Sequence, residues 1–117
     1  MRYDLVQGEA FVLDITDIKL DGVAISNFDE YEVSFALKYN VKNTDANADI
    51  LIDSTTNASR FVLSSNSVEI EGITSAESND LDTKYYVYEV WAYKSSTEYL
   101  VDRGEIRILE TAYADKI

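Results

Sequence analysis

Carboxylates are the most plentiful side chains in this sequence among those able to do chemistry. The 117 residues include 22 Asp and Glu against 10 Lys and Arg, and the formal net charge is −12. Asp14, Asp17 and Asp21 lie close together in front of a glycine, and a hard cation such as Ca²⁺ prefers several oxygen ligands. Their spacing is not that of an EF-hand loop, and no bidentate acid follows at the required distance. We therefore expect solvated turn residues here and no metal site.

The other sets of side chains that catalyse reactions are incomplete. The sequence has no His and no Cys, so the usual general base, the commonest metal ligand and any thiolate nucleophile are missing. Ser64 and Ser65 therefore lack a partner for nucleophilic catalysis, and the 4 glycines are too scattered for a phosphate-binding loop. Glu69 and Glu71 have the spacing of one solvent-facing side of a strand. A pair of acids about 5–10 Å apart, as glycosidases need, arises by chance among so many carboxylates. We expect no catalytic residue, no cofactor and no enzymatic activity.

The charge balance also limits the partners. Phosphate backbones and anionic membranes are bound by Lys and Arg, so a net charge of −12 argues against both. No apolar run is long enough to cross a bilayer, and residues 1–11 lack the apolar core of a signal peptide. We expect synthesis in a cytoplasm, and mutual repulsion that keeps free copies apart in solution.

Aromatic side chains gather in residues 84–94, which hold four of the 9 tyrosines and the single tryptophan. At the two-residue period of a strand, Tyr85, Trp91 and Tyr93 lie on one face and Tyr86 and Tyr88 on the other. Since both faces carry large apolar groups, either the strand is central with both faces covered or one face is an interface. The first set could form a platform for a protein or a sugar ring. Alternatively, the tryptophan fills the core, as in immunoglobulin domains.

Alternation of apolar and polar residues predicts strands through most of the chain. The clearest is 31–41, with apolar residues on one face and Glu32, Ser34, Ala36 and Lys38 on a face expected to meet solvent. Residues 74–82 are the one place for a helical turn, capped by Thr74 or Ser75, with Glu77 or Ser78 closing the first turn. Ile18 and Leu20 are expected to extend the second strand, and Ile25 and Phe28 to pack on the core from a connector. The predicted strands are 2–6, 11–16, 31–41, 50–52, 61–63, 68–73, 84–94, 97–101 and 105–109.

About eight or nine short strands with turns between them are typical of an all-β sandwich or barrel. The length suits a single domain, 1–117, in which we expect 111–117 to be a tail. The most strongly alternating strands should bury their apolar faces together. The predicted core comprises Val33, Phe35, Leu37, Tyr86, Tyr88, Val90, Ile106 and Ile108.

Several motifs occur in an order that carries more information than any one of them. They are Gln7-Gly8 with Phe11, Asp21-Gly22 with Ile25 and Phe28, the strand 31–41, Tyr86-Val87-Tyr88-Glu89-Val90, and Gly104 with Ile106 and Ile108. This order and spacing resemble a family of small tailed-phage structural proteins that includes the N-terminal domain of the lactococcal-phage baseplate upper protein. The resemblance covers residues 4–111. The sequence departs from that pattern at Thr83-Lys84, where a glycine is usual, and at Glu89, where Asp is commoner.

The resemblance implies an immunoglobulin-like antiparallel β-sandwich that serves as a non-enzymatic building block of a virion. We expect an adaptor in the tail, baseplate, neck or fibre-attachment region, bound to other virion proteins and to copies of itself in a symmetric ring. A capsid decoration protein is one alternative, and a carbohydrate-binding module that contacts a host-surface glycan is another. The candidate interface residues come from the first strand, the aromatic strand and the tail: Leu5, Val6, Tyr85, Trp91, Tyr93, Tyr113 and Ile117.

Overall fold

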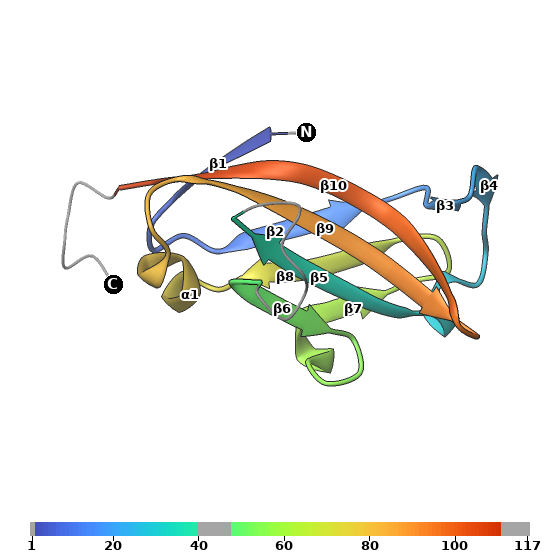
Figure 1. Ribbon diagram of the computed structural model, residues 1–117. Coiled ribbons are helices and arrows are strands. Elements are labelled where there is room, and N and C mark those ends of the chain that lie inside the picture. Colours follow the sequence, from blue (N-terminus) through green and yellow to red (C-terminus); the bar gives the residue numbers. More distant parts are fainter. Residues whose placement is uncertain (1, 40–47, 111–117) are drawn as a thin grey trace.

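Two β-sheets pack face to face around one hydrophobic core in a computed structural model that describes residues 2–39 and 48–110 (Figure 1). The larger sheet has the strand order β1-β10-β9-β5-β6, and the smaller has the order β2-β8-β7. The predicted all-β sandwich is therefore confirmed. The larger sheet comprises β1 (Arg2–Val6), β10 (Thr97–Leu109), β9 (Tyr85–Lys94), β5 (Glu32–Lys38) and β6 (Ile50–Asp53); the smaller comprises β2 (Phe11–Ile15), β8 (Val68–Ile73) and β7 (Phe61–Leu63).

A small hairpin, β3 (Lys19–Leu20) with β4 (Val23–Ala24), stands apart from both sheets. Leu20 was expected to extend the second strand, but Asp17 takes a positive φ of 52° and separates β3 from β2. The described chain thus has ten strands rather than eight or nine. Phe28 follows in a 3₁₀ turn, η1 (Phe28–Glu30), and is fully buried, as predicted for the connector.

The pairing of the first strand differs from the expected antiparallel sheet. β1 runs parallel to β10, with Leu5 opposite Ile108, whereas the other strand pairs are antiparallel. β10 is one continuous strand of 13 residues where two strands were predicted. Gly104 pairs with Tyr88 instead of ending a strand, and a bulge between Leu100 and Asp102 absorbs the irregularity.

The core lies between the two sheets and contains all eight residues predicted for it. Phe35 and Tyr88 stack with their ring centroids 5.9 Å apart, and Phe11 from the smaller sheet lies 5.9 Å from Tyr88. Gly72 on β8 leaves room for this packing, since a Cβ there would come within 2.6 Å of the Phe35 ring. The aromatic rings thus interlock across both sheets.

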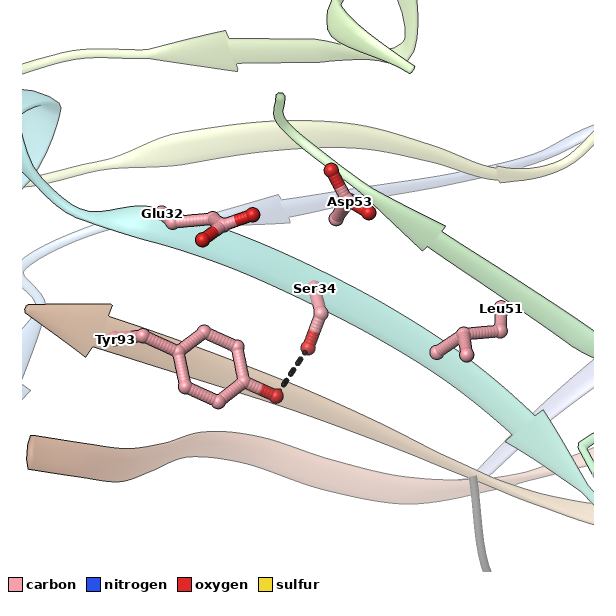
Figure 2. Close-up of a pocket in the computed structure, with 5 residues that line it drawn as sticks. All are labelled: Glu32, Ser34, Leu51, Asp53 and Tyr93. Atoms are coloured by element: carbon pink, nitrogen blue, oxygen red, sulfur yellow. Dashed lines mark hydrogen bonds between the residues drawn. The ribbon is translucent and has the colours of Figure 1, made fainter. Parts of the chain in front are cut away.

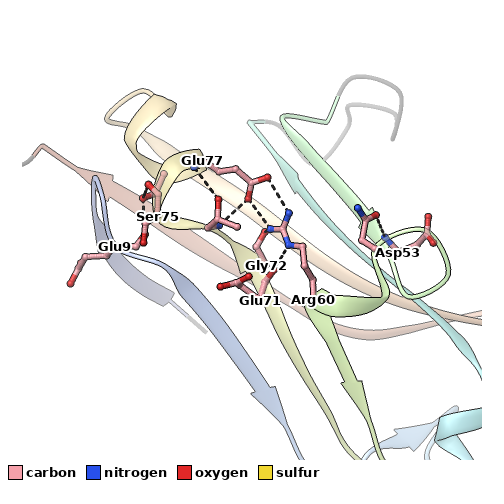
Figure 3. Close-up of polar contacts among 10 residues, drawn as sticks. Glu9, Asp53, Arg60, Glu71, Gly72, Ser75 and Glu77 are labelled. Atoms are coloured by element: carbon pink, nitrogen blue, oxygen red, sulfur yellow. Dashed lines mark hydrogen bonds and ion pairs between the residues drawn. The ribbon is translucent and has the colours of Figure 1, made fainter. Parts of the chain in front are cut away.

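The short helix α1 (Ser75–Asp80) starts at the predicted cap. The Thr74 hydroxyl accepts a hydrogen bond from the Glu77 amide, and the Glu77 carboxylate accepts one from the Thr74 amide, which forms a capping box. Arg60, at the end of the 3₁₀ turn η3 (Ala58–Arg60), donates to Glu77 and to the carbonyls of Glu71 and Gly72 (Figure 3). One guanidinium therefore ties the segment before β7 to the end of β8 and to α1.

Of the four β5 residues that were expected to meet solvent, Glu32 is exposed and the other three are buried. Ser34, Ala36 and Lys38 are each at most 7% exposed. β5 lies between β9 and β6, and large side chains of β9 cover it: the Ser34 hydroxyl lies 3.0 Å from the Tyr93 hydroxyl, and Lys38 Nζ lies 3.3 Å from Glu89 Oε1. The prediction of a polar outward face is wrong because alternation within one strand does not show the length of its neighbours' side chains. Residues 40 and 41 of the predicted strand lie outside the described residues.

Candidate interface on the outer face of the larger sheet

The larger sheet has a second side, here called the outer face, which is turned away from the smaller sheet. Within residues 2–39 and 48–110, no further sheet covers it. Its composition follows from the strand registers, because residues directly opposite on neighbouring strands share a face. It carries Arg2, Asp4 and Val6 from β1; Glu98, Leu100, Arg103, Glu105, Arg107 and Leu109 from β10; Tyr85, Val87, Glu89, Trp91 and Tyr93 from β9; Glu32, Ser34, Ala36 and Lys38 from β5; and Leu51 and Asp53 from β6.

The aromatic side chains of β9 divide as the two-residue period predicts. Tyr86 and Tyr88 are buried in the core, whereas Tyr85, Trp91 and Tyr93 lie on the outer face. Tyr85 is exposed, and the other two are half-buried. Trp91 stands between Leu100 and Ser34 of the neighbouring strands. The alternative in which Trp91 fills the sandwich core is therefore wrong, because the inward positions beside it, Val90 and Ala92, already supply the core contacts there.

A buried carboxylate, that of Glu89, lies in the middle of the outer face. Glu89 is 5% exposed, and it accepts hydrogen bonds from Lys38 and from the Nε and Nη2 atoms of Arg103. Burial raises the pKa of this carboxyl, but the hydrogen bonds and positive charges of Arg103 and Lys38 outweigh burial and hold the pKa below its ordinary value. The cluster is thus a charged, well-connected centre between the two ends of the face.

One end of the outer face carries an acidic pocket of about 280 Å³ (Figure 2). Its lining includes Glu32, Asp53 and the Tyr93 ring, whose hydroxyl pairs with Ser34. Asp53 Oδ1 accepts the amides of Thr55 and Thr56 at 2.9 and 2.6 Å, which fixes this carboxylate at the rim. Glu98 lies opposite Tyr93 on β10 and adds a third carboxylate. An aromatic ring among carboxylates suits a cationic group or a sugar.

The other end carries a pocket of about 300 Å³ lined by Arg2, Asp4 and Arg107. Arg107 donates two hydrogen bonds to Asp4, at 3.2 and 3.1 Å. The Arg2 guanidinium carbon lies 4.8 Å from the centre of the Tyr85 ring, and that of Arg107 lies 5.9 Å from it. Two arginines therefore flank one exposed tyrosine, an arrangement that suits an anionic group.

The candidate residues outside β9 have different positions. Leu5 was proposed as an interface residue, but it is 5% exposed and packs in the core opposite Ile108, so it does not offer a surface. Val6 is half-buried at the end of β1, and its pairing with Leu109 places it on the outer face with Asp4. Tyr113 and Ile117 lie outside the described residues. The basic end was missed because its arginines come from β1 and β10, which only the parallel pairing brings together.

The acidic turn residues do not form a cation site in the described parts of the chain. Asp17 and Asp21 each take a positive φ of 52°, as turn residues do. Among the residues that the structure describes, no three His, Cys, Asp or Glu side chains gather as metal ligands would. No helix in those same ranges has the length and apolar character needed to span a membrane. A comparison of the sequence with protein-family models finds no match, and a comparison with curated proteins finds no significant one.

Proposed function

We propose that this chain is a non-enzymatic structural protein of a tailed-phage virion, an adaptor in the tail, baseplate, neck or fibre-attachment region. The motif order that resembles phage structural proteins supports this proposal. The observation that carries it is the outer face, a whole sheet face on which Leu51, Leu100 and Tyr85 are 49%, 42% and 43% exposed. Exposed apolar and aromatic side chains that share one sheet face with charged groups favour contact with another protein.

Open strand edges offer a second means of assembly. Among the described strands, β6 ends the larger sheet on one side, and β2 and β7 end the smaller one. Each such edge has unpaired N–H and C=O groups, which a neighbour satisfies by adding a strand. Copies of this chain would join a symmetric ring through such edges, and the outer face would supply a further contact within the assembly.

Purified particles from the genome that carries this gene provide the test. Electron microscopy of particles with the labelled protein should place it in the tail, baseplate or neck; a position over the capsid surface would support a decoration role instead. Leu51→Glu should lower incorporation at least about tenfold, because it replaces an exposed apolar side chain of the outer face with a charge. Val62→Glu is the matched control, since Val62 is 61% exposed on the smaller sheet. Absence of the protein from purified particles would show the proposal to be wrong.

A carbohydrate-binding role is a second candidate, favoured by the acidic pocket. Sugar rings stack on aromatic side chains and donate hydroxyls to carboxylates, and Tyr93 stands beside Glu32 and Asp53. A glycan microarray probed with the wild type and with Tyr93→Ala decides it. Binding that the variant loses would support a glycan-contacting module, and no binding by the wild type would exclude this role for the glycans on the array.

A further inference from the structure

The outer face has its charges sorted along its length. At the end near Tyr93, Glu32, Asp53 and Glu98 are three acids without a basic residue among the outer-face positions of the described chain. The half that runs from Glu89 to Tyr85 differs. It holds four bases, Arg2, Lys38, Arg103 and Arg107, against three acids, Asp4, Glu89 and Glu105. This half therefore has a positive balance in a chain whose net charge is −12.

The acidic and basic pockets lie on the same face of the sheet. A face-to-face contact between two copies can therefore pair each pocket with one of opposite charge. A two-fold axis that lies in the plane of the outer face, perpendicular to the line between the pockets, brings a second copy face to face. The same rotation sets the acidic pocket of each copy over the basic pocket of the other. The rotation also exchanges the two ends of β9, so Trp91 of one copy faces the Val87 end of the other, and the Glu89 clusters of the two copies meet in the middle. The single two-fold rotation thus brings opposite charges together at two places in the contact.

The geometry points to a second copy of this chain as the occupant of the outer face, held by reciprocal contacts between Glu32 and Asp53 of one copy and Arg2 and Arg107 of the other. This inference rests on the proposed role in assembly and specifies one of its contacts. A closed ring whose members also make this contact would have dihedral symmetry, with two rings back to back.

The size of the face indicates how tight the contact is. Tyr85 and Tyr93 are eight residues apart, about 27 Å at the rise of a strand, and five strands span roughly 20 Å. The face therefore buries roughly 500–600 Å² per copy, at the low end of specific interfaces. The net charge of each copy also opposes approach. We expect a dissociation constant on the order of 0.1 mM, so that dilute copies are separate and concentrated ones pair.

Charge exchange tests the inference in solution. Sedimentation velocity of the full chain, up to about 1 mM protein in about 0.15 M salt, should show dimers. Glu32→Lys and Arg2→Glu each place like charges at both contacts, and each should weaken pairing at least about tenfold. An equal mixture of the two variants restores opposite charges at both contacts, and it should dimerise to within about threefold of the wild type.

Matched variants control for net charge and for folding. Glu69→Lys on the smaller sheet matches the charge change of Glu32→Lys, and Lys19→Glu on β3 matches that of Arg2→Glu. Both control variants should dimerise as the wild type does. Circular dichroism should show that all variants keep the β-sandwich. A wild type that stays monomeric at about 1 mM, or a mixture that does not recover, would overturn the inference. Particles larger than dimers would overturn the two-fold arrangement. Each of these results leaves the virion proposal standing, because that proposal depends on the protein's presence in purified particles.

Discussion

Glu89 forms ion pairs with two cations, Lys38 and Arg103, in the middle of the outer face. Glu89→Gln removes the carboxylate that pairs with the buried Lys38 ammonium and with the half-exposed Arg103 guanidinium. When one partner of a buried ionic cluster is removed, the remaining buried charge loses a favourable interaction, and the folded state is destabilised. We expect the free energy of unfolding at pH 7 to fall by about 2–4 kcal/mol in urea denaturation. The solvent-exposed change Glu69→Gln is the control and should shift it by less than about 0.5 kcal/mol.

The pH dependence of the same variant follows from the pKa of Glu89. That pKa is below 4.5 in the folded chain, so the carboxylate stabilises the fold fully above the unfolded value. This contribution is lost as the pH falls through the folded pKa. The stability difference between the wild type and Glu89→Gln should therefore shrink between about pH 5 and about pH 2. A difference that stays constant over that range would show that the charge on Glu89 is not what stabilises the cluster.

Gly72 is required by the ring of Phe35. A Cβ at position 72 would lie 2.6 Å from the ring, which is fully buried. Gly72→Ala should therefore lower the free energy of unfolding by about 1–3 kcal/mol. Phe35→Ala alone should cost about 3–5 kcal/mol, because it leaves a cavity.

The double variant tests whether the two effects share one cause. In a chain that already carries Phe35→Ala, the alanine at position 72 meets no ring and should cost nothing further. The measurement is a double-mutant cycle by urea unfolding. Additive effects would show that Gly72 is needed for a reason other than the Phe35 ring.

At the scale of an element, the turn between β9 and β10 has a conformation that its residues do not favour. Ser95 and Ser96 have φ values of 51° and 69° in a two-residue loop that joins Lys94 to Thr97. Two-residue hairpin turns with positive φ at both positions prefer Asn-Gly. Replacing the pair by Asn-Gly should raise the free energy of unfolding by about 0.5–1 kcal/mol, measured by thermal and urea denaturation. A loss of stability would mean that the serine side chains make contacts that outweigh the backbone strain.

Arg60 connects three elements through one side chain (Figure 3). Arg60→Lys keeps the charge but loses the planar set of donors that reaches two carbonyls and a carboxylate together. We expect a loss of about 1–3 kcal/mol in unfolding free energy. Hydrogen exchange should show faster opening of the segment before β7 and of α1, while the amides of β9 keep their protection. Equal acceleration throughout the chain would show that Arg60 acts on global stability alone.

Sequence patterns predicted the elements well where the alternation within one strand is enough to show which of its side chains face the core. The alternation in β5 and β9 and the capping residues Thr74 and Glu77 are local signals, and the structure confirms the strands, the helical turn and the core. Sequence patterns failed where a neighbouring strand determines the burial or the length of a strand. Lys38 and Ser34 are buried by side chains of β9, and β10 continues through Gly104 because its partner strand does. The acidic and basic pockets were out of reach for the same reason, since each combines residues from separate strands.

At the scale of the whole molecule, the net charge of −12 acts on stability as well as on association. Like charges that are exposed repel one another in the compact state, and salt screens this repulsion. Raising the NaCl concentration from about 10 mM to about 150 mM should therefore increase the free energy of unfolding by about 1 kcal/mol. A decrease would show that the ion pairs, such as Arg107 with Asp4, outweigh the general repulsion.

The parallel pairing of β1 with β10 has a consequence during translation. The partner of Asp4 on β10 is Arg107, 103 residues later, and a ribosome that adds about 5–20 residues per second needs roughly 5–20 s to reach it. Throughout that interval, Tyr3 and Leu5 of the nascent chain have no strand to pair with, whereas β2, β7 and β8 are all synthesised before it ends. The smaller sheet can therefore form on the ribosome before the larger one, and the first strand joins the sandwich last.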